Sequence, residues 1–201
     1  MTDVVFILDR SGSMGGLESD TIGGYNSLLE KQKKSGEQIR VTTVLFDDRY
    51  ELLHNREDIE SVKPMTAEQY YVRGCTALYD AVGKTINLIK NTSSDKVLMV
   101  ITTDGLENSS REFRGNDIRK MITAQREKGW EFLFLGANID SAETAERMGI
   151  SRSRAADYVA DSDGVAVNYE CLEKAVASYA ALGRVEDDWS EGIRENYRKK
   201  R

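Results

Sequence analysis

VVFIL at residues 4–8, followed directly by DRSGS at residues 9–13, is the stretch of sequence that decides the fold. Its first five residues form a short, wholly apolar run, which is typical of a β-strand covered by helices on both faces. Gly15 and Gly16 interrupt the run, and apolar residues at helical spacing follow between residues 22 and 29. The chain therefore opens with a buried strand, a short polar loop and an amphipathic helix.

The same alternation continues along the chain. Further strands are predicted at Val41–Phe46, Val97–Ile101, Phe132–Leu135 and Ala155–Ala160, with Tyr50–Leu53 pairing back as an edge strand. Helical patterns separate most of these runs. Strands that alternate with helices predict an α/β fold with a mainly parallel, doubly wound sheet and helices on both of its faces. Such folds bind ligands beyond the carboxyl ends of their strands, so functional residues are expected just after the strands.

Length and composition indicate one globular domain. We expect that domain to span residues 1–183 of the 201, and residues 184–201 to form a charged, solvated tail that ends in the basic run Arg198–Arg201. The net charge of −6 argues against nucleic acid as a partner, because phosphate binding needs clustered basic residues. The two cysteines, Cys75 and Cys171, are too few for a disulfide framework, and we expect reduced, packed thiols.

No apolar run approaches the roughly 20 residues that a membrane span needs, so no membrane association is predicted. The apolar run that begins at Val4 follows an acidic start and is too short for a signal peptide. A cytoplasmic protein is the resulting expectation. The oligomeric state is left open by the sequence.

Five oxygen-bearing side chains lie where this fold would place a site. Asp9, Ser11 and Ser13 follow the first strand, Asp104 follows the strand that ends at Ile101, and Thr76 begins a predicted helix. Small, hard oxygen ligands suit Mg²⁺ rather than Zn²⁺, which prefers histidine and cysteine; Mn²⁺ and Ca²⁺ remain alternatives. The site carries only two carboxylates, so a bound metal would favour a further anionic oxygen from outside.

The same residues carry a family resemblance. The run Asp9–Ser13, then Thr76, then Asp104-Gly105 resembles the metal-ion-dependent adhesion site of von Willebrand factor A domains. The resemblance extends from about Asp3 to about Leu182. It implies a six-stranded sheet in the order 3-2-1-4-5-6 with one antiparallel edge strand.

The resemblance also implies the role of each site residue. Ser11, Ser13 and Thr76 would bind the metal directly, and Asp9 and Asp104 would act largely through water. A protein partner would complete the shell with an Asp or Glu. The chain would then be a metal-dependent protein-binding module and not an enzyme. Arg10 fills a variable position of the motif and is given no role.

Other interpretations are open to these residues. Taken singly, Asp9 with Ser11 or Thr76 would more simply be a helix cap, and Asp104-Gly105 a turn. Their joint position at strand ends favours the metal site. An Mg²⁺-dependent phosphotransferase or phosphatase with Asp9 as nucleophile is the alternative function, although that chemistry usually needs more carboxylates on the metal and a lysine.

The remaining candidates carry less weight. The one histidine, His54, precedes Asp104 and lies on the predicted edge strand, so a hydrolase triad in the order Ser-Asp-His is excluded. We expect His54 to be a surface or packing residue. Glu107, Asn108 and Arg111 follow Asp104 and could contact a partner, but solvated loop residues are the better interpretation.

Overall fold

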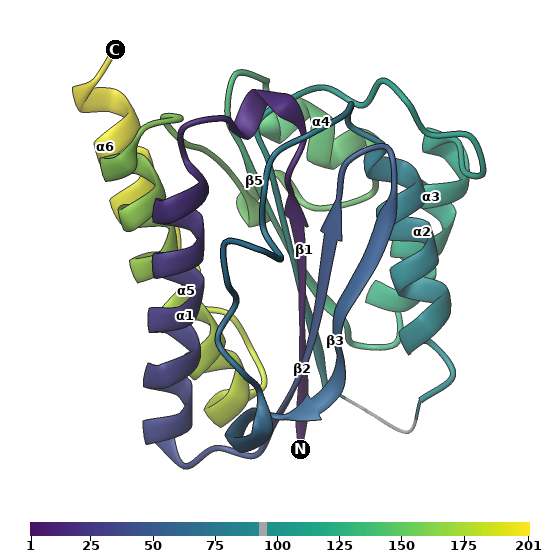
Figure 1. Cartoon of the computed structure of the whole chain (residues 1–201). Coiled ribbons are helices and arrows are strands. Elements are labelled where there is room, and N and C mark those ends of the chain that lie inside the picture. The colour runs from purple at the N-terminus through teal and green to yellow at the C-terminus, as the bar shows by residue number, and fades with distance from the viewer. Residues whose placement is uncertain (93–95) are drawn as a thin grey trace.

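The structure is a computed structural model that describes residues 1–92 and 96–201. Its centre is a six-stranded sheet in the order β3-β2-β1-β4-β5-β6 (Figure 1). The strands are β1 (Thr2–Asp9), β2 (Ile39–Phe46), β3 (Tyr50–Asp58), β4 (Val97–Thr103), β5 (Glu131–Gly136) and β6 (Ala155–Asp157). All neighbouring strands pair in parallel except β2 and β3, which are antiparallel. The predicted fold class, strand order and antiparallel edge strand are confirmed.

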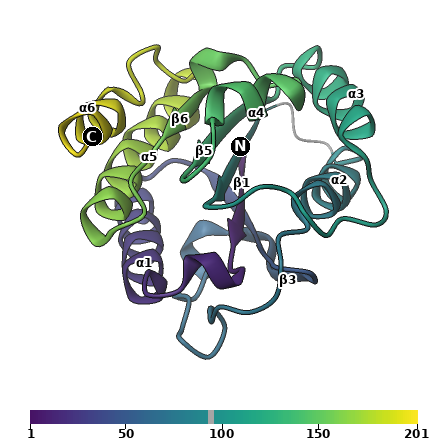
Figure 2. The same ribbon diagram turned by 90° about the horizontal axis from the view of Figure 1, so that it is seen from above.

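Six α-helices in the described part of the chain cover the sheet. They are α1 (Glu18–Ser35), α2 (Leu78–Ile89), α3 (Gly115–Arg126), α4 (Ser141–Arg147), α5 (Ser162–Leu182) and α6 (Glu191–Lys199). Figure 2 shows α1, α5 and α6 on one side of the sheet and α2 and α3 on the other. Successive side chains of a strand point to opposite faces, so β1 contributes Val4, Phe6 and Leu8 to one core and Val5 and Ile7 to the other.

Local sequence explains where the long helices begin and end. Asp161 precedes α5 and its carboxylate accepts a hydrogen bond from the backbone N–H of Gly164, which satisfies one of the free donors at the helix start. Gly36 and Gly183 follow α1 and α5 with φ of 72°, a left-handed conformation that glycine adopts without strain.

The C-terminal segment differs from the expected solvated tail. Residues 191–199 form α6, and the side chains of Val185, Trp189 and Ile193 are buried against the rest of the chain. The indole N–H of Trp189 donates to the carbonyl of Ser153 at 3.0 Å. The expectation of a solvated tail rested on the many charged residues of this segment and did not consider the three apolar residues that pack against the domain. The domain boundary at residue 183 stays a prediction.

Smaller differences concern the sheet edges and one cysteine. β3 runs to Asp58, beyond the predicted Leu53, whereas β6 ends at Asp157 instead of Ala160. Cys171 is buried as expected, but the expectation for Cys75 is wrong, because its residue is exposed. Within the described part of the chain, no helix has the length and apolar character needed to cross a bilayer.

The N-terminus and the candidate site residues lie at opposite ends of the sheet. Met1 lies at the end of the sheet where the parallel strands start, and the last residues of α6 lie at the opposite end (Figure 1). The carboxyl ends of β1 and β4, where the candidate residues are expected, are at this second end. The fold thus gathers them far from the N-terminus.

Candidate metal centre

The central strand pair places the first two carboxylates side by side. β1 and β4 are adjacent and parallel, with Leu8 opposite Thr102, so Asp9 lies next to Thr103 and Asp104. The hydroxyl of Thr103 donates to Asp9 Oδ2 at 2.6 Å. Asp9 and Asp104 are both buried, with 1% and 2% of their surface exposed. Two acidic side chains therefore face the same small region at the end of the sheet.

The loop after β1 turns two hydroxyls toward that region. Asp9 Oδ1 accepts a hydrogen bond from the backbone N–H of Ser11 at 2.7 Å, which tightens the turn. A single 3₁₀ turn, Gly12–Met14, follows. Ser11 Oγ and Ser13 Oγ lie 3.1 Å apart as a result.

Thr76 supplies the third hydroxyl from a separate loop. Its Oγ1 lies 3.1 Å from Ser11 Oγ, and its backbone N–H donates to Asn108 Oδ1 at 2.9 Å. The two loops are joined by a hydrogen bond from the N–H of Gly12 to the carbonyl of Gly74 at 3.2 Å. Gly74 has a φ of 64°, which favours glycine at this position.

Asp104 completes the group but keeps one oxygen free. Its Oδ1 accepts a hydrogen bond from Ser13 Oγ at 2.5 Å. Its Oδ2 is buried and has no hydrogen-bond partner among the described residues. The structure therefore brings all five predicted side chains together: Ser11, Ser13, Thr76 and Asp104 are linked directly, and Asp9 joins them through the backbone of Ser11.

The electrostatics of the two carboxylates are unfavourable as they stand. Burial raises the pKa of Asp9 to about 6, even though hydrogen bonds from Thr103 and Ser11 lower it, and the nearby charge of Asp104 raises it further. Burial also raises the pKa of Asp104. Over residues 1–92 and 96–201, neither carboxylate forms an ion pair with a basic side chain. Because neither carboxylate has a positive partner, keeping both charges buried costs free energy.

The spacing of the hydroxyl oxygens fits a small hard cation. Ligands about 2.1 Å from Mg²⁺ in an octahedron lie about 3 Å from one another. The Ser11–Ser13 and Ser11–Thr76 oxygen pairs are both 3.1 Å apart. A Cβ atom on Gly105 would lie 3.5 Å from both Ser13 Oγ and Thr76 Oγ1, an ordinary contact distance, so Gly105 directly borders these two hydroxyls. The donor set consists of hydroxyl and carboxylate oxygens, as hard cations require; no group of three His, Cys, Asp or Glu that could hold a metal occurs among the described residues.

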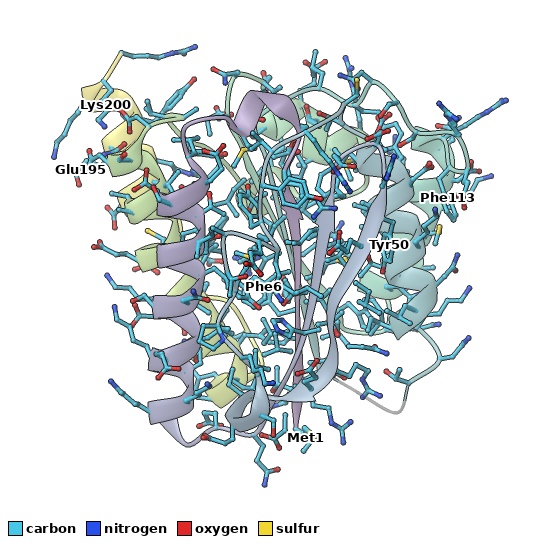
Figure 3. The ribbon with its side chains drawn as sticks, viewed as in Figure 1. Met1, Phe6, Tyr50, Phe113, Glu195 and Lys200 are labelled. Atoms are coloured by element: carbon cyan, nitrogen blue, oxygen red, sulfur yellow. The ribbon has the colours of Figure 1, made fainter. Side chains whose placement is uncertain are left out.

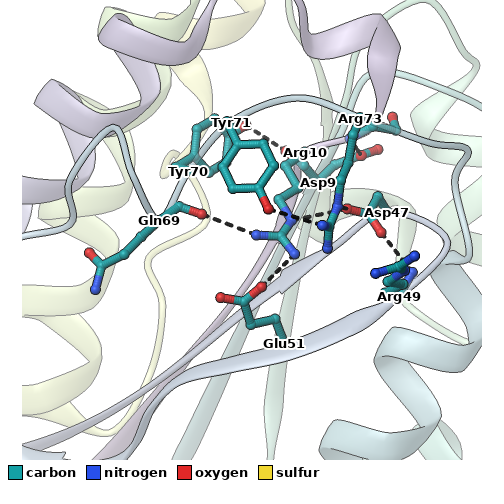
Figure 4. Close-up of polar contacts among 10 residues, drawn as sticks. Asp9, Arg10, Asp47, Arg49, Glu51, Gln69, Tyr70, Tyr71 and Arg73 are labelled. Atoms are coloured by element: carbon teal, nitrogen blue, oxygen red, sulfur yellow. Dashed lines mark hydrogen bonds and ion pairs between the residues drawn. The ribbon is translucent and has the colours of Figure 1, made fainter.

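Arg10, which the sequence analysis left without a role, forms a buried ionic network beside this site (Figure 4). Its side chain is fully buried. Its Nε donates to Asp47 Oδ2 at 3.1 Å, its Nη2 to Glu51 Oε2 at 2.6 Å and its Nη1 to the carbonyl of Gln69 at 3.0 Å. No local pattern reveals this, because its partners lie far away in the sequence.

Asp47 is the centre of that network. Arg73 Nε also donates to Asp47 Oδ2, at 2.6 Å, and the backbone carbonyl of Asp47 accepts from the N–H of Ala77, the residue after Thr76. The ring of Tyr71 lies against both guanidinium groups, with the Cζ atoms of Arg10 and Arg73 5.4 and 5.2 Å from its centroid. The network thus ties the loop of Ser11 to the segment that carries Thr76.

The residues after Asp104 divide into structural and exposed groups. Glu107 accepts hydrogen bonds from the N–H groups of Tyr79 and Ser110, and Asn108 holds Thr76, so both have structural roles that the sequence analysis did not predict. Leu106 is 65% exposed beside the site, a feature that was also not predicted. His54 is buried, and its Nδ1 lies 3.3 Å from the hydroxyl of Tyr25, so it is a packing residue.

Comparison with known families identifies the chain. Residues 3–168 match the von Willebrand factor type A domain, and the protein belongs to this family. No curated protein matched in a search by sequence.

Among solved structures, the domain is similar to the von Willebrand factor domain of the type V pili tip protein Mfa5 from Porphyromonas gingivalis. The TM-score is 0.67 at 10% identity, over 92% of this chain and 98% of that one. Proximal thread matrix protein 1 from the mussel byssus was solved with a zinc-occupied metal-ion-dependent adhesion site (MIDAS) motif. It gives a TM-score of 0.62 at 15% identity. That match covers 88% of this chain but 46% of the byssus protein, so the present chain spans about half its length. At these identities the likeness concerns the fold alone.

Proposed function

We propose that this domain is a metal-dependent protein-binding module that holds Mg²⁺ at the end of its sheet. Ser11, Ser13 and Thr76 would bind the ion directly, with Asp9 and Asp104 acting largely through water. The bound ion would supply a Lewis-acidic docking point for a carboxylate. An Asp or Glu of a protein partner is the carboxylate that we propose.

The unpartnered Oδ2 of Asp104 carries this proposal. It is a buried carboxylate oxygen, and its neighbours are hydroxyls spaced as ligands of one small cation. A buried charge without a partner is retained rarely, since an apolar or neutral side chain would be less costly there. A cation would remove this cost. The zinc-occupied motif of the byssus protein supports the proposal by analogy within the same fold.

The surroundings suit a protein partner more than a small substrate. Gly105 borders the hydroxyls of Ser13 and Thr76, and the exposed side chains of Leu106 and Tyr71 flank the loops that carry the site. Aromatic and apolar side chains around a charged centre are common at protein-binding surfaces. Tyr71 is moreover held in place by two guanidinium groups, so little side-chain freedom is lost on binding.

The alternative phosphotransferase function is less well supported. Asp9 would have to attack phosphorus, but it is 1% exposed and both of its oxygens accept hydrogen bonds, from Ser11 and Thr103. A nucleophile must reach its substrate, so this carboxylate is better placed to hold a loop than to react.

Titration calorimetry with Mg²⁺ tests the metal site directly. We expect saturable binding to the wild type and at least a tenfold weaker affinity for Ser13→Ala, because one ligand oxygen is removed. Ser27→Ala is the matched control, since Ser27 is exposed in the middle of α1, more than two helical turns beyond the start of that helix. Equal affinity of Ser13→Ala and the wild type would refute the assignment.

A carboxylate probe separates binding from catalysis. With Mn²⁺ in place of Mg²⁺, we expect ¹³C-acetate to show enhanced relaxation in the presence of the wild type and not of Ser13→Ala. Metal-dependent release of phosphate from a generic phosphomonoester, lost in Asp9→Ala, would instead favour the enzyme.

A further inference from the structure

A hollow lined by arginines and alanines lies beside β6 at the edge of the sheet, and its lining shares no residue with the candidate metal centre. Its volume is about 420 Å³, and it follows β6 between α4 and α6. Figure 2 shows β6 next to α6 at this margin of the sheet. Three arginines line it, namely Arg152, Arg194 and Arg198. We call this hollow the β6 groove.

Of the four basic residues at the C-terminus, Arg198–Arg201, only Arg198 lines the β6 groove. Glu195 and Lys200 lie near the C-terminal end of the chain (Figure 3). Lys199 Nζ pairs with Glu195 at 2.7 Å, and Lys200 Nζ pairs with Asp161 and Asp163, each at 2.8 Å. Arg201 lies over the ring of Tyr197. Arg198, in contrast, forms no ion pair or hydrogen bond with any described residue. Three of the four basic residues are thus used within the protein, and the fourth faces the β6 groove.

Arg194 is held in place beside Arg198. The two residues are four positions apart on α6 and therefore lie on the same face of the helix. Arg194 Nη2 donates to the carbonyl of Ala155 at 3.3 Å, which ties the side chain to the edge strand while its other donors stay free. The guanidinium groups of Arg194 and Arg198 thus line the same part of the groove.

Nearby carboxylates oppose this positive charge but do not cancel it. Glu146 pairs with Arg152 at 3.0 Å, but both side chains are mostly exposed, and such pairs are weak. Asp157 also lines the groove, and its Oδ1 accepts a hydrogen bond from the backbone N–H of Ser141. The charge of Glu195 also acts on Arg198 from outside the groove, but Glu195 is paired with Lys199. Three guanidinium groups line the groove beside the single carboxylate of Asp157, so the lining is positively charged on a protein whose net charge is −6.

The rest of the lining is apolar. Ala142, Ala155 and Ala156 face the groove, together with the ring of Tyr197. A volume of about 420 Å³ is within the range of small-molecule sites and well above what a single inorganic ion needs. Guanidinium groups recognise phosphate through paired hydrogen bonds. We infer that the β6 groove binds a small phosphate monoester, with the phosphate on Arg194 and Arg198 and the organic group against the alanines and Tyr197.

Phenyl phosphate and inorganic phosphate are the probes, because they share the phosphate and differ in the ring. Each is titrated into the full chain at constant ionic strength, with chemical shifts followed by NMR. We expect saturable binding of phenyl phosphate with a dissociation constant of about 1 mM or tighter, and weaker binding of inorganic phosphate. Arg198→Gln should weaken the affinity at least about tenfold, since a charge-assisted contact is lost.

Lys199→Gln is the matched control, because it removes the same charge from the same helix outside the groove. We expect it to leave the affinity within about twofold of the wild type. Arg194→Gln should also weaken binding, and the melting temperature of each variant shows whether it folds. Equal losses in Lys199→Gln and Arg198→Gln would overturn the inference and indicate general attraction of anions. Absence of saturation with phenyl phosphate would overturn it as well. Both results are independent of the metal centre.

Discussion

Asp47 and Asp104 are buried carboxylates at the same end of the sheet, and they differ in what neutralises them. Asp47 Oδ2 accepts hydrogen bonds from the guanidinium groups of Arg10 and Arg73. Burial raises the pKa of Asp47, but the bonds from Arg73 and the N–H of Arg49 outweigh it, so the pKa lies below its usual value. The pKa of Asp104 is raised, and its Oδ2 has no partner among the described residues.

This contrast separates a carboxylate that is neutralised within the described chain from one that is not. The charge of Asp47 is balanced within the chain, so its function is to hold the loops of Ser11 and Thr76 together. The charge of Asp104 is not balanced within the chain. The chain thus buries arginines beside Asp47 but places no basic partner beside Asp104 among the described residues, and this difference is what the proposed cation would remove.

Removing the balanced charge should have the largest effect. We expect Asp47→Asn to lower the free energy of unfolding by about 3 kcal/mol, because it leaves buried Arg10 with an incomplete set of partners. Urea denaturation measures the change, and Glu37→Gln, at an exposed position, is the control. A loss below about 0.5 kcal/mol, as for an ordinary surface substitution, would contradict a structural role for Asp47.

Removing the unbalanced charge should cost much less. In the presence of a chelator, we expect Asp104→Asn to leave the free energy of unfolding unchanged or to raise it, because a buried charge without a positive partner is replaced by a neutral group. With Mg²⁺ added in excess, the wild type should gain stability and Asp104→Asn should not. If Asp104→Asn without metal were as destabilising as Asp47→Asn, the carboxylate would have a partner within the chain.

His54 sharpens the comparison with the smallest effect, because it is a buried group that becomes a cation on protonation. Desolvation lowers its pKa from 6.5, although the charge of Glu57 acts in the opposite direction. The unfolded chain therefore binds a proton more readily than the folded one. The contribution of His54 to stability is fully present above pH 6.5 and is lost as the pH falls below it.

His54→Gln should accordingly reduce the loss of melting temperature between pH 7 and pH 5. The difference between the two proteins isolates the histidine, because the carboxylates titrate in both. Parallel curves for wild type and variant would show that His54 keeps its ordinary pKa.

Most of the fold follows from local patterns, because apolar runs and helical spacing act over a few residues. The runs at 4–8 and 97–101 predicted central strands, and the strand order came with the family resemblance. The proximity of Asp9 and Asp104 was likewise predictable, since parallel strands end at one edge, whereas Thr76 precedes a helix and its place in the site was implied by the family resemblance. Whether a metal binds there stays a prediction.

The rest depends on contacts between distant residues, which no local pattern contains. Arg10 could not be assigned a role, because Asp47 and Glu51 come from another strand and its turn. The packing of Trp189 depends on a carbonyl 36 residues earlier in the chain. Arg198 was taken for part of a solvated run, since the sequence does not show that its three basic neighbours would find partners and it would not.

The position of Met1, opposite the carboxyl ends of the parallel strands, has a practical consequence (Figure 1). A domain tethered to a surface through its N-terminus would present the loops of Ser11, Thr76 and Asp104 outward. Tethering through Arg201 would instead crowd the same end of the molecule, together with the β6 groove. The polarity of the sheet thus determines which immobilised form of the domain leaves its candidate sites accessible to a partner in solution.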